Sequence, residues 1–196
     1  MNITHIDIIR HGEPEGGRRY RGHGVNDPLS PKGWQQMWNA VPDQPVWEHV
    51  ISSPLLRCLG FAEALAPHLG ASLSVEDDLK EIGFGTWEGR TPDDIKANEG
   101  DALEKFMLDP VNNRPEGAEP LAAFTDRVWN VYERVAKDYQ GKHVLIVAHA
   151  GVIRAITSKI LRMHLDDVYS KLKIDYAAIA STVIVDGKPP KLILRA

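Results

Sequence analysis

Residues 6–13, IDIIRHGE, are the stretch on which the predicted fold depends. The stretch begins with β-branched, mostly apolar residues, which favour an extended strand. The strand then ends abruptly at Arg10, His11 and Gly12, where a cation, an imidazole and a residue that permits sharp turns follow one another. Because ligands of open α/β sheets bind at the carboxyl ends of strands, we expect a polar site at the end of this first strand.

The composition is that of an ordinary globular domain. The chain has 196 residues, 43% hydrophobic and 26% charged, which suits a single α/β domain over residues 1–196. Its net charge, 23 − 27 = −4, argues against a nucleic-acid partner. The one cysteine, Cys58, excludes an internal disulfide and a thiolate zinc site. Without a signal-peptide pattern or a membrane-length apolar run, we expect a cytoplasmic protein that contacts no membrane.

Capping signals and apolar runs divide the chain into alternating strands and helices. Ser-Pro pairs at 30–31 and 53–54 and a Thr-Pro pair at 91–92 predict helix starts. After the first strand we expect strands at 46–52, 71–75 and 142–148, another within 174–185, and an antiparallel edge strand at 191–194. Helices are expected at 31–40, 54–69, from 92 onward, and at 101–108, 121–139 and 150–161. This order predicts a three-layer α/β/α fold with a mainly parallel central sheet.

Two irregular segments are long enough to carry function. Residues 13–28 are rich in glycine, arginine and histidine and have no usable periodicity. Loops of this length inside a compact domain are usually functional. Residues 109–120 are polar and proline-rich. Together with the helix at 101–108, they predict a lid-like excursion at about 101–120.

Reactive side chains gather at one predicted edge of the sheet. Arg10, His11, Arg57 and His149 each follow a predicted parallel strand, and Glu81 lies on the loop after the short third strand. Two arginines and two histidines would form a cationic pocket, because the planar guanidinium fork fits a phosphate group. The helix that starts near residue 54 would add free N–H groups. The pattern predicts a phosphate monoester as ligand.

The two histidines allow two kinds of chemistry. A metal site is disfavoured because the sequence has no His-Glu-x-x-His stretch and arginines would repel a divalent cation. We therefore expect neither a metal nor a cofactor. The alternative is that neutral His11 attacks phosphorus and forms phosphohistidine, since nearby cations lower its pKa. Glu81 would then protonate the leaving alkoxide and afterwards activate water.

Several motifs, met in order along most of the chain, resemble the histidine phosphatase superfamily, also called the phosphoglycerate mutase-like family. They are RHGE at 10–13, DPLS at 27–30 with Gly33, SSPLLR at 52–57, LKEIGFGTWEG at 79–89 and AHAGVIR at 148–154. The resemblance implies that His11 is the phosphorylated nucleophile and Glu81 the proton donor. It also implies that Arg10, Arg57 and His149 complete a phosphate pocket that needs no metal.

Two positions depart from the family pattern. Many relatives have an asparagine that contacts phosphate six residues after the nucleophile, where this chain has Gly17. We expect Arg21 or a backbone N–H group to make that contact. Phe61 replaces a family threonine, which we interpret as a packing change. The predicted substrate-binding residues are Arg10, Arg57, Arg21, Gly17 and Ala150. The remaining histidines are expected to be structural or at the surface: His5, His23, His49, His68, His143 and His164.

The resemblance predicts a histidine acid-type phosphatase, a monomer or homodimer that acts on a small phosphorylated metabolite. Cofactor-dependent mutases have a longer closing segment, and the stretch GTWEG at 85–89 suggests a more open site that admits water. Among the phosphatases, the chain looks most like the α-ribazole-5′-phosphate phosphatases of cobalamin biosynthesis. Alternatives are a phosphoglycerate mutase and a sugar (bis)phosphatase whose second anion meets the arginines at 18–21. A non-catalytic phosphate-binding module is disfavoured, because both His11 and Glu81 are present.

Overall fold

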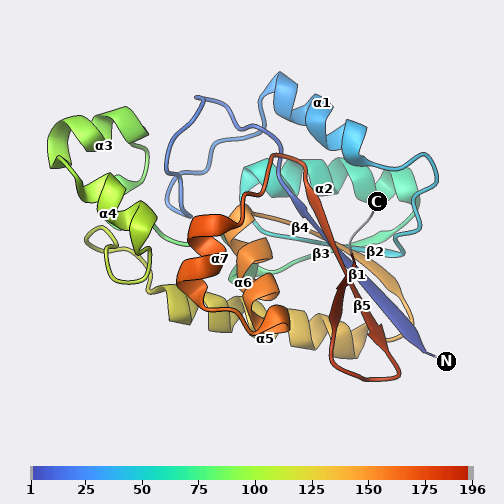
Figure 1. Cartoon of the computed structure of the whole chain (residues 1–196). Coiled ribbons are helices and arrows are strands. Elements are labelled where there is room, and N and C mark those ends of the chain that lie inside the picture. The colour runs from blue at the N-terminus through green and yellow to red at the C-terminus, as the bar shows by residue number, and fades with distance from the viewer. Residues whose placement is uncertain (1, 194–196) are drawn as a thin grey trace.

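A six-stranded sheet between two layers of helices forms the centre of the computed structural model, which describes residues 2–193 (Figure 1). The strand order is β3-β2-β4-β1-β5-β6. The pairs among β3, β2, β4 and β1 are parallel, whereas β5 is antiparallel to both β1 and β6. This arrangement confirms the predicted fold. The strands are β1 Ile3–Arg10, β2 His49–Ser52, β3 Ser72–Val75, β4 His143–Ala148, β5 Ile179–Val185 and β6 Lys191–Ile193.

Each central strand sends alternate side chains into two different cores. On one face Ile8 and Ile146 pack with residues of α5 (Leu121–Asp138) and α6 (Ala150–Leu161). On the other face Ile9 and Leu145 pack with residues of α1 (Pro31–Ala40) and α2 (Leu56–Leu69). Since both faces of β4 are covered, residues 144–147 are all fully buried. This double burial explains the continuous apolar run in the sequence.

Two short helices, α3 (Pro92–Glu99) and α4 (Ala102–Leu108), lie beyond the carboxyl ends of the parallel strands (Figure 1). They pack around a third, smaller core made by Trp87, Ile95 and Phe106. The 3-10 turns η1 (Asp77–Leu79) and η2 (Gly85–Trp87) lead into this region. The predicted excursion at 101–120 thus consists of α4 and a following loop, which Arg114 ties back through a 2.9 Å hydrogen bond to the carbonyl of Gly83.

Some predicted boundaries were wrong. The second helix begins at Leu56 rather than at residue 54, because the Ser53 side chain contacts His149 instead of capping the helix. The second strand begins at His49 rather than at 46, since pairing with β3 and β4 starts only there. Helix α7 (Leu165–Lys171) was not predicted, because two turns are too short for a clear periodic signal. The last residue of the strand expected at 191–194 lies outside the described residues.

Three other features agree with the capping signals. Ser30 caps α1 by accepting a hydrogen bond from the backbone of Gly33, and Thr91 forms a capping box with Asp94 at the start of α3. Gly70 ends α2 in the left-handed conformation. Within residues 2–193, no helix combines the length and apolarity that crossing a membrane requires.

Candidate active site

His11 and His149 lie side by side at the ends of the two central strands. β1 and β4 pair in parallel with Arg10 opposite Ala148, so the next residue of each strand is a neighbour of the other. The backbone N–H of His11 donates to the Ala148 carbonyl at 2.9 Å, and the two imidazole centroids are 5.2 Å apart. Both side chains are buried. Strand pairing therefore brings together two residues that are 138 positions apart in the chain (149 − 11).

The protonation of His11 is defined by a backbone contact. Its Nδ1 lies 2.7 Å from the carbonyl oxygen of Gly12, which only accepts hydrogen bonds, so Nδ1 carries the proton. Burial lowers the pKa of His11 well below its ordinary value, and the charges of Arg57 and Arg10 lower it further. The ring is therefore neutral, with the lone pair on Nε2. This is the form of imidazole that attacks phosphorus.

Gly12 allows this geometry because the loop packs directly against α1. A Cβ atom at position 12 would lie 2.3 Å from the carbonyl oxygen of Gly33, closer than any real contact. The chain after β1 is therefore pressed onto the first turn of the helix. This explains why a glycine follows His11 at the end of the decisive stretch.

His149 is fixed by residues of the neighbouring strand and helix. Its Nε2 lies 2.8 Å from the hydroxyl of Ser53, which follows β2, and the Cys58 sulfur lies 3.6 Å from the same nitrogen. Burial, followed by the charges of Arg57 and His11, lowers the pKa of His149 well below its ordinary value. Burial also raises the pKa of Cys58 to about 12, so the thiol stays protonated and unreactive.

These two buried histidines predict that stability falls in mild acid. In the unfolded chain both would bind protons below about pH 6.5, whereas in the fold they stay neutral. The unfolded state thus gains protons as the pH falls, and the free energy of unfolding decreases below that pH. Urea unfolding between pH 7.5 and 5.5 should show this slope. His11→Gln should reduce this slope by the equivalent of about one bound proton. His68→Gln, on the exposed part of α2, should leave the slope unchanged. Equal slopes for all three proteins would contradict the prediction.

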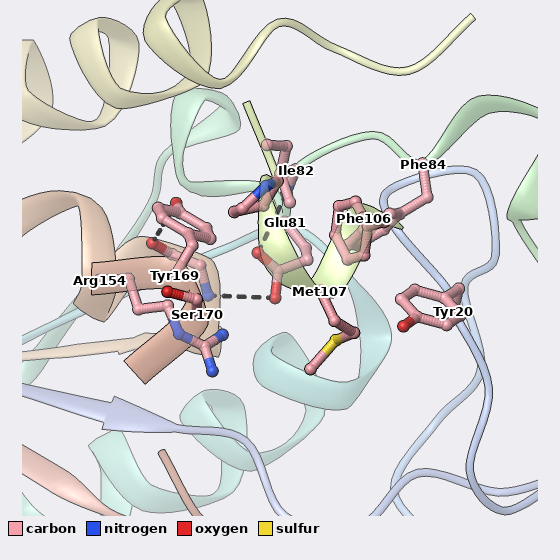
Figure 2. A pocket seen from close by; sticks show the side chains of 11 residues that line it. Tyr20, Glu81, Ile82, Phe84, Phe106, Met107, Arg154, Tyr169 and Ser170 are labelled. Atoms are coloured by element: carbon pink, nitrogen blue, oxygen red, sulfur yellow. Dashed lines mark hydrogen bonds between the residues drawn. The ribbon is translucent and has the colours of Figure 1, made fainter. Parts of the chain in front are cut away.

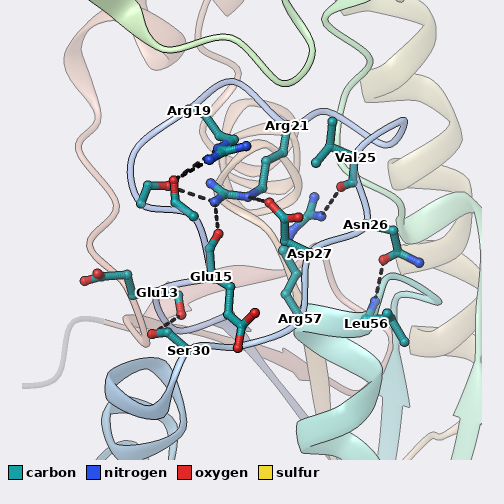
Figure 3. A network of polar contacts seen from close by, with 12 residues as sticks. Glu13, Glu15, Arg19, Arg21, Val25, Asn26, Asp27, Ser30, Leu56 and Arg57 are labelled. Carbon is teal, nitrogen blue, oxygen red and sulfur yellow. Dashed lines mark hydrogen bonds and ion pairs between the residues drawn. The ribbon is translucent and has the colours of Figure 1, made fainter.

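Arg57 stands in the first turn of α2 and is almost completely buried. Its Nη1 donates to the Val25 carbonyl at 2.9 Å and its Nη2 to the Gly22 carbonyl at 2.7 Å, which anchors it to the loop at 13–28 (Figure 3). Burial lowers its pKa, but a guanidinium keeps its charge at neutral pH. The buried Nε has no hydrogen-bond partner among the described residues.

Arg10, next to His11 in the chain, repeats this pattern. Its Nη1 donates to the Ile174 carbonyl at 2.5 Å, and its guanidinium carbon lies 4.1 Å from the centre of the Tyr176 ring. Its Nε is also buried and also lacks a partner among residues 2–193. Two cationic N–H donors that are buried without an acceptor, both beside His11, mark a place where an oxyanion would complete the hydrogen bonding.

Arg57→Lys is expected to lower kcat/KM for p-nitrophenyl phosphate by about 10²-fold or more. A lysine ammonium has neither the Nε–H that faces the site nor the fork that holds two loop carbonyls. Steady-state kinetics at neutral pH measure this effect. Arg134→Lys, in which the replaced arginine forms an exposed ion pair with Glu76, is the control and should leave kcat/KM unchanged. Near-normal turnover of the Arg57 variant would show that Arg57 is not part of the active site.

Arg21 supports the loop at 13–28 from within. Its Nε donates to Asp27 at 2.9 Å and its Nη2 to the carbonyls of Glu15 and Gly17 at 2.5 and 2.8 Å (Figure 3). Arg21 lies near enough to His11 to contribute to its lowered pKa. Gly17 itself is exposed and only its carbonyl is engaged, with Arg21. The structure thus brings Arg21 to the cluster but not Gly17.

The start of α2 differs from the expectation of several free N–H groups. The N–H of Leu56, the first residue of the helix, donates to the side chain of Asn26 at 2.7 Å (Figure 3). The N–H of Cys58 donates to the carbonyl of Leu55 at 2.8 Å. These donors are committed to the protein, so the arginine side chains are the main cationic groups of the site.

Glu81 is held at the N-terminus of α6, beside His149. Its Oε2 accepts a hydrogen bond from the backbone of Gly151 at 3.3 Å, and its Oε1 accepts one from Ile82 at 3.0 Å (Figure 2). Burial lowers the pKa of both Arg10 and Arg57, and the Glu81 carboxylate opposes this lowering, which places it within the same electrostatic cluster. Ala150 is buried between His149 and Gly151. The structure therefore brings His11, His149, Arg10, Arg57 and Glu81 to one edge of the sheet.

Gly151→Ala is expected to impair proton transfer by Glu81. A Cβ atom at position 151 would lie 2.1 Å from Glu81 Oε1, so the carboxylate must move. We expect a loss of about tenfold or more in kcat/KM for an alkyl phosphate such as glycerol 3-phosphate. Gly60→Ala is the matched control, because its Cβ would meet only Trp34 at 3.7 Å. Unchanged turnover by the Gly151 variant would show that the observed position of Glu81 is unimportant.

Three residues near Glu81 were given no role in the predicted site. Tyr169, on the unpredicted helix α7, donates to the Gly151 carbonyl at 3.0 Å and so supports the backbone that holds Glu81. Arg154 lies one turn further along α6 and stood in the motif at 148–154 without an assigned role. His23 was expected to be structural or superficial, and it is exposed, but its Nδ1 lies 3.2 Å from the Glu81 carbonyl.

Two pockets open beside the cluster and share Tyr20 and Arg154. The first, of about 180 Å³, is lined by Glu81 and by apolar or aromatic residues, among them Phe84, Phe106 and Met107 (Figure 2). The second, of about 550 Å³, is lined by Arg10 and further cationic residues. Within the described range 2–193, no group of three or more histidine, cysteine or carboxylate side chains is arranged to hold a metal ion.

The sequence from residue 6 to residue 194 matches the histidine phosphatase superfamily, branch 1. The chain belongs to this superfamily. It is 32% identical over 185 residues to the bifunctional protein Rv2228c of Mycobacterium tuberculosis, covering 90% of this chain and 49% of that one. The chain thus spans about half the length of the mycobacterial relatives it matches.

Two further relatives are matched by this chain over three quarters or more of their own length. An uncharacterized phosphatase of Bacillus subtilis, PhoE, is 30% identical, with 81% of this chain and 78% of that one covered. A probable phosphoglycerate mutase of Escherichia coli, GpmB, is also 30% identical, with coverage of 81% and 75%. One of these two relatives is named a phosphatase and the other a probable phosphoglycerate mutase.

Solved structures share the fold of this superfamily member. YhfR of Bacillus stearothermophilus has a TM-score of 0.87 at 24% identity, covering 96% of this chain and 95% of that one. The α-ribazole phosphatase of Shigella flexneri has a TM-score of 0.82 at 23% identity, with coverage of 97% and 95%. At these identities the likeness shows the common fold.

Proposed function

We propose that this protein is a phosphatase that transfers the phosphoryl group of a small phosphate monoester first to His11 and then to water. The observation that carries the proposal is the neutral, Nδ1-protonated His11 ring near two arginines whose buried Nε–H groups find no acceptor within residues 2–193. Phosphate oxygens bound by those donors would hold phosphorus in front of a nucleophilic nitrogen.

In the first step, His11 Nε2 forms a bond to phosphorus while the bond from phosphorus to the ester oxygen breaks. Glu81, in its protonated form, gives its proton to that oxygen, so the alcohol leaves as a neutral molecule. Arg10 and Arg57 stabilise the negative charge on the phosphoryl oxygens during transfer. His149 stays neutral at neutral pH, because its pKa is lowered. Its ring lies 5.2 Å from that of His11, so it would be a neighbour of the phosphoryl group during transfer.

In the second step, water attacks the phosphorus of phosphohistidine, and the bond from phosphorus to Nε2 breaks. The Glu81 carboxylate takes a proton from the water, which returns Glu81 to its starting form. Inorganic phosphate leaves, and His11 is again neutral with its proton on Nδ1. Glu81 is suited to both steps because it lines the pocket of about 180 Å³ in which the leaving alcohol, and later the water, would lie.

We propose that the segment 101–120 acts as a lid over this pocket. Phe106, Met107 and Pro110 belong to the segment and line the pocket opposite Glu81. Met107 and Leu108 are also exposed to solvent, at 53% and 82%. An apolar lid of this kind suits a leaving group with an apolar surface, since each contact removes apolar area from water.

Hydrolysis and isomerisation would both begin with the same phosphohistidine. We favour hydrolysis because the stretch GTWEG at 85–89 suggests an open site that admits water. The α-ribazole phosphatase of Shigella shares the fold, and α-ribazole 5′-phosphate is accordingly one proposed substrate. Phosphoglycerate mutase activity is the second candidate, since the GpmB relative carries that name.

A panel of phosphorylated metabolites tests the proposal. It should include α-ribazole 5′-phosphate and 3-phosphoglycerate, the latter incubated with a trace of 2,3-bisphosphoglycerate. We expect release of inorganic phosphate and no efficient formation of 2-phosphoglycerate. Isomerisation without phosphate release would establish the mutase instead. No turnover of any monoester, p-nitrophenyl phosphate included, would refute the enzymatic function.

A further inference from the structure

The pocket of about 550 Å³ beside the proposed phosphate site is strongly cationic. Its lining contains the side chains of Arg10, Arg18, Arg19, Arg154 and Lys173 and only two carboxylates, Glu13 and Asp175. Glu13 already pairs with Lys32 at 2.7 Å, and Asp175 with Lys173 at 2.8 Å. The chain as a whole has a net charge of −4, so this concentration of positive charge in one pocket indicates an anionic ligand.

The four arginines of this pocket are not neutralised by the protein. Within residues 2–193, none of them forms an ion pair with a carboxylate, whereas Arg21, Arg90, Arg127 and Arg134 each do. Arg154 is held by a 3.0 Å hydrogen bond from its Nε to the Leu172 carbonyl. Arg19 is held by the Gly16 carbonyl. These guanidinium groups are positioned but keep their charge available.

The cationic pocket opens directly beside the reacting centre. It shares Arg10 with the phosphate cluster, and the ring of its lining residue Tyr176 lies 5.9 Å from the ring of His11. The neighbouring pocket of about 180 Å³ is a poor place for a second anion, because it contains the Glu81 carboxylate and mainly apolar walls. A substrate that carries one phosphate at His11 and a second anionic group would therefore extend toward the arginines.

We propose that the cationic pocket binds a second anionic group, a carboxylate or phosphate, on the part of the substrate that does not react. This inference rests on the proposed phosphatase function and narrows its substrate class to monoesters that carry a second anionic group. Arg18 and Lys173, from the loop at 13–28 and the segment after α7, act as specificity-determining residues. Arg154 lies where the two pockets meet and would contact the group that joins the two anions.

Two matched pairs of substrates test this proposal by phosphate release. Glycerol 3-phosphate and 3-phosphoglycerate differ chiefly in a carboxylate, and fructose 6-phosphate and fructose 1,6-bisphosphate differ in a second phosphate. At least one pair should show a preference of about tenfold or more in kcat/KM for the member with the second anionic group at low salt. The preference should shrink as ionic strength rises, because these side chains face solvent.

Arg18→Gln and Lys173→Gln identify the groups responsible. Both side chains are exposed, Lys173 at 84%, so both variants should fold. Each should reduce the preference about three- to tenfold while turnover of glycerol 3-phosphate stays within twofold of wild type. Lys137→Gln, on α5, removes the same charge from an exposed position outside either pocket and should keep the preference.

The outcomes separate this proposal from the proposed function. Turnover of p-nitrophenyl phosphate without preference in either pair would overturn the second-anion site and leave the phosphatase standing. A preference that survives in both variants would also overturn it. Failure of every monoester, by contrast, would refute the phosphatase function itself.

Discussion

His11→Ala is expected to lower kcat/KM for p-nitrophenyl phosphate by at least about 10³-fold. The variant loses the nucleophilic Nε2, and no other side chain in the cluster offers a neutral nitrogen in the same place. His149 is also neutral, but its Nε2 lies 2.8 Å from the Ser53 hydroxyl and is therefore already engaged. The residual rate should come only from the arginines. Steady-state release of p-nitrophenolate measures the effect.

The matched control for this loss is His68→Ala. His68 is exposed near the end of α2 and packs only against Trp38, at 5.6 Å between ring centres. Its replacement should leave kcat/KM within twofold of wild type. Circular dichroism of the His11 variant should show an unchanged fold. A folded His11→Ala protein with wild-type activity would show that the phosphatase mechanism runs through another residue.

Glu81→Gln is expected to slow hydrolysis of alkyl phosphates by about 10²- to 10⁴-fold. Glutamine keeps the shape of the side chain and one of the two oxygens that accept from Ile82 and Gly151, but it cannot transfer a proton to the leaving alkoxide. A p-nitrophenolate ion leaves with little help. For p-nitrophenyl phosphate we therefore expect a much smaller loss, of about tenfold or less.

The ratio of the two losses, measured with glycerol 3-phosphate and p-nitrophenyl phosphate, is the informative quantity. Glu88→Gln provides a control for the loop, because Glu88 accepts from the backbone of Phe84 but lines neither pocket. That variant should slow both substrates alike if it disturbs the loop at all. Equal losses for Glu81→Gln on both substrates would remove its role as proton donor.

Much of the site was predictable because the pairing of parallel strands determines which residues lie together at their ends. Arg10 ends β1, and His11 and His149 directly follow the two central strands, so in this parallel pair they must meet. The fold was predictable from the apolar run of β4, which requires cover on both faces, and from the Ser30 cap, which marks where one covering helix begins.

Other parts of the site depend on contacts that a sequence pattern does not encode. Ser53 looks like a helix cap, yet its hydroxyl contacts His149, and the helix starts later. Tyr169 supports Glu81 through Gly151 from a helix too short to be periodic. Arg21 or a backbone N–H group was expected to make a phosphate contact, and two of the Arg21 nitrogens also hold Asp27 and the loop carbonyls. Each depends on where a distant segment packs.

The phosphohistidine intermediate itself offers the most direct test of the account. Wild-type protein mixed with p-nitrophenyl phosphate, quenched within milliseconds and digested, should yield one peptide that carries a phosphoryl group on His11, detected by mass spectrometry. Glu81→Gln should accumulate more of this species with the same substrate, because the second step also needs the carboxylate. Phosphate release with no phosphorylated His11 at any time, or with the phosphoryl group on another residue, would contradict the account.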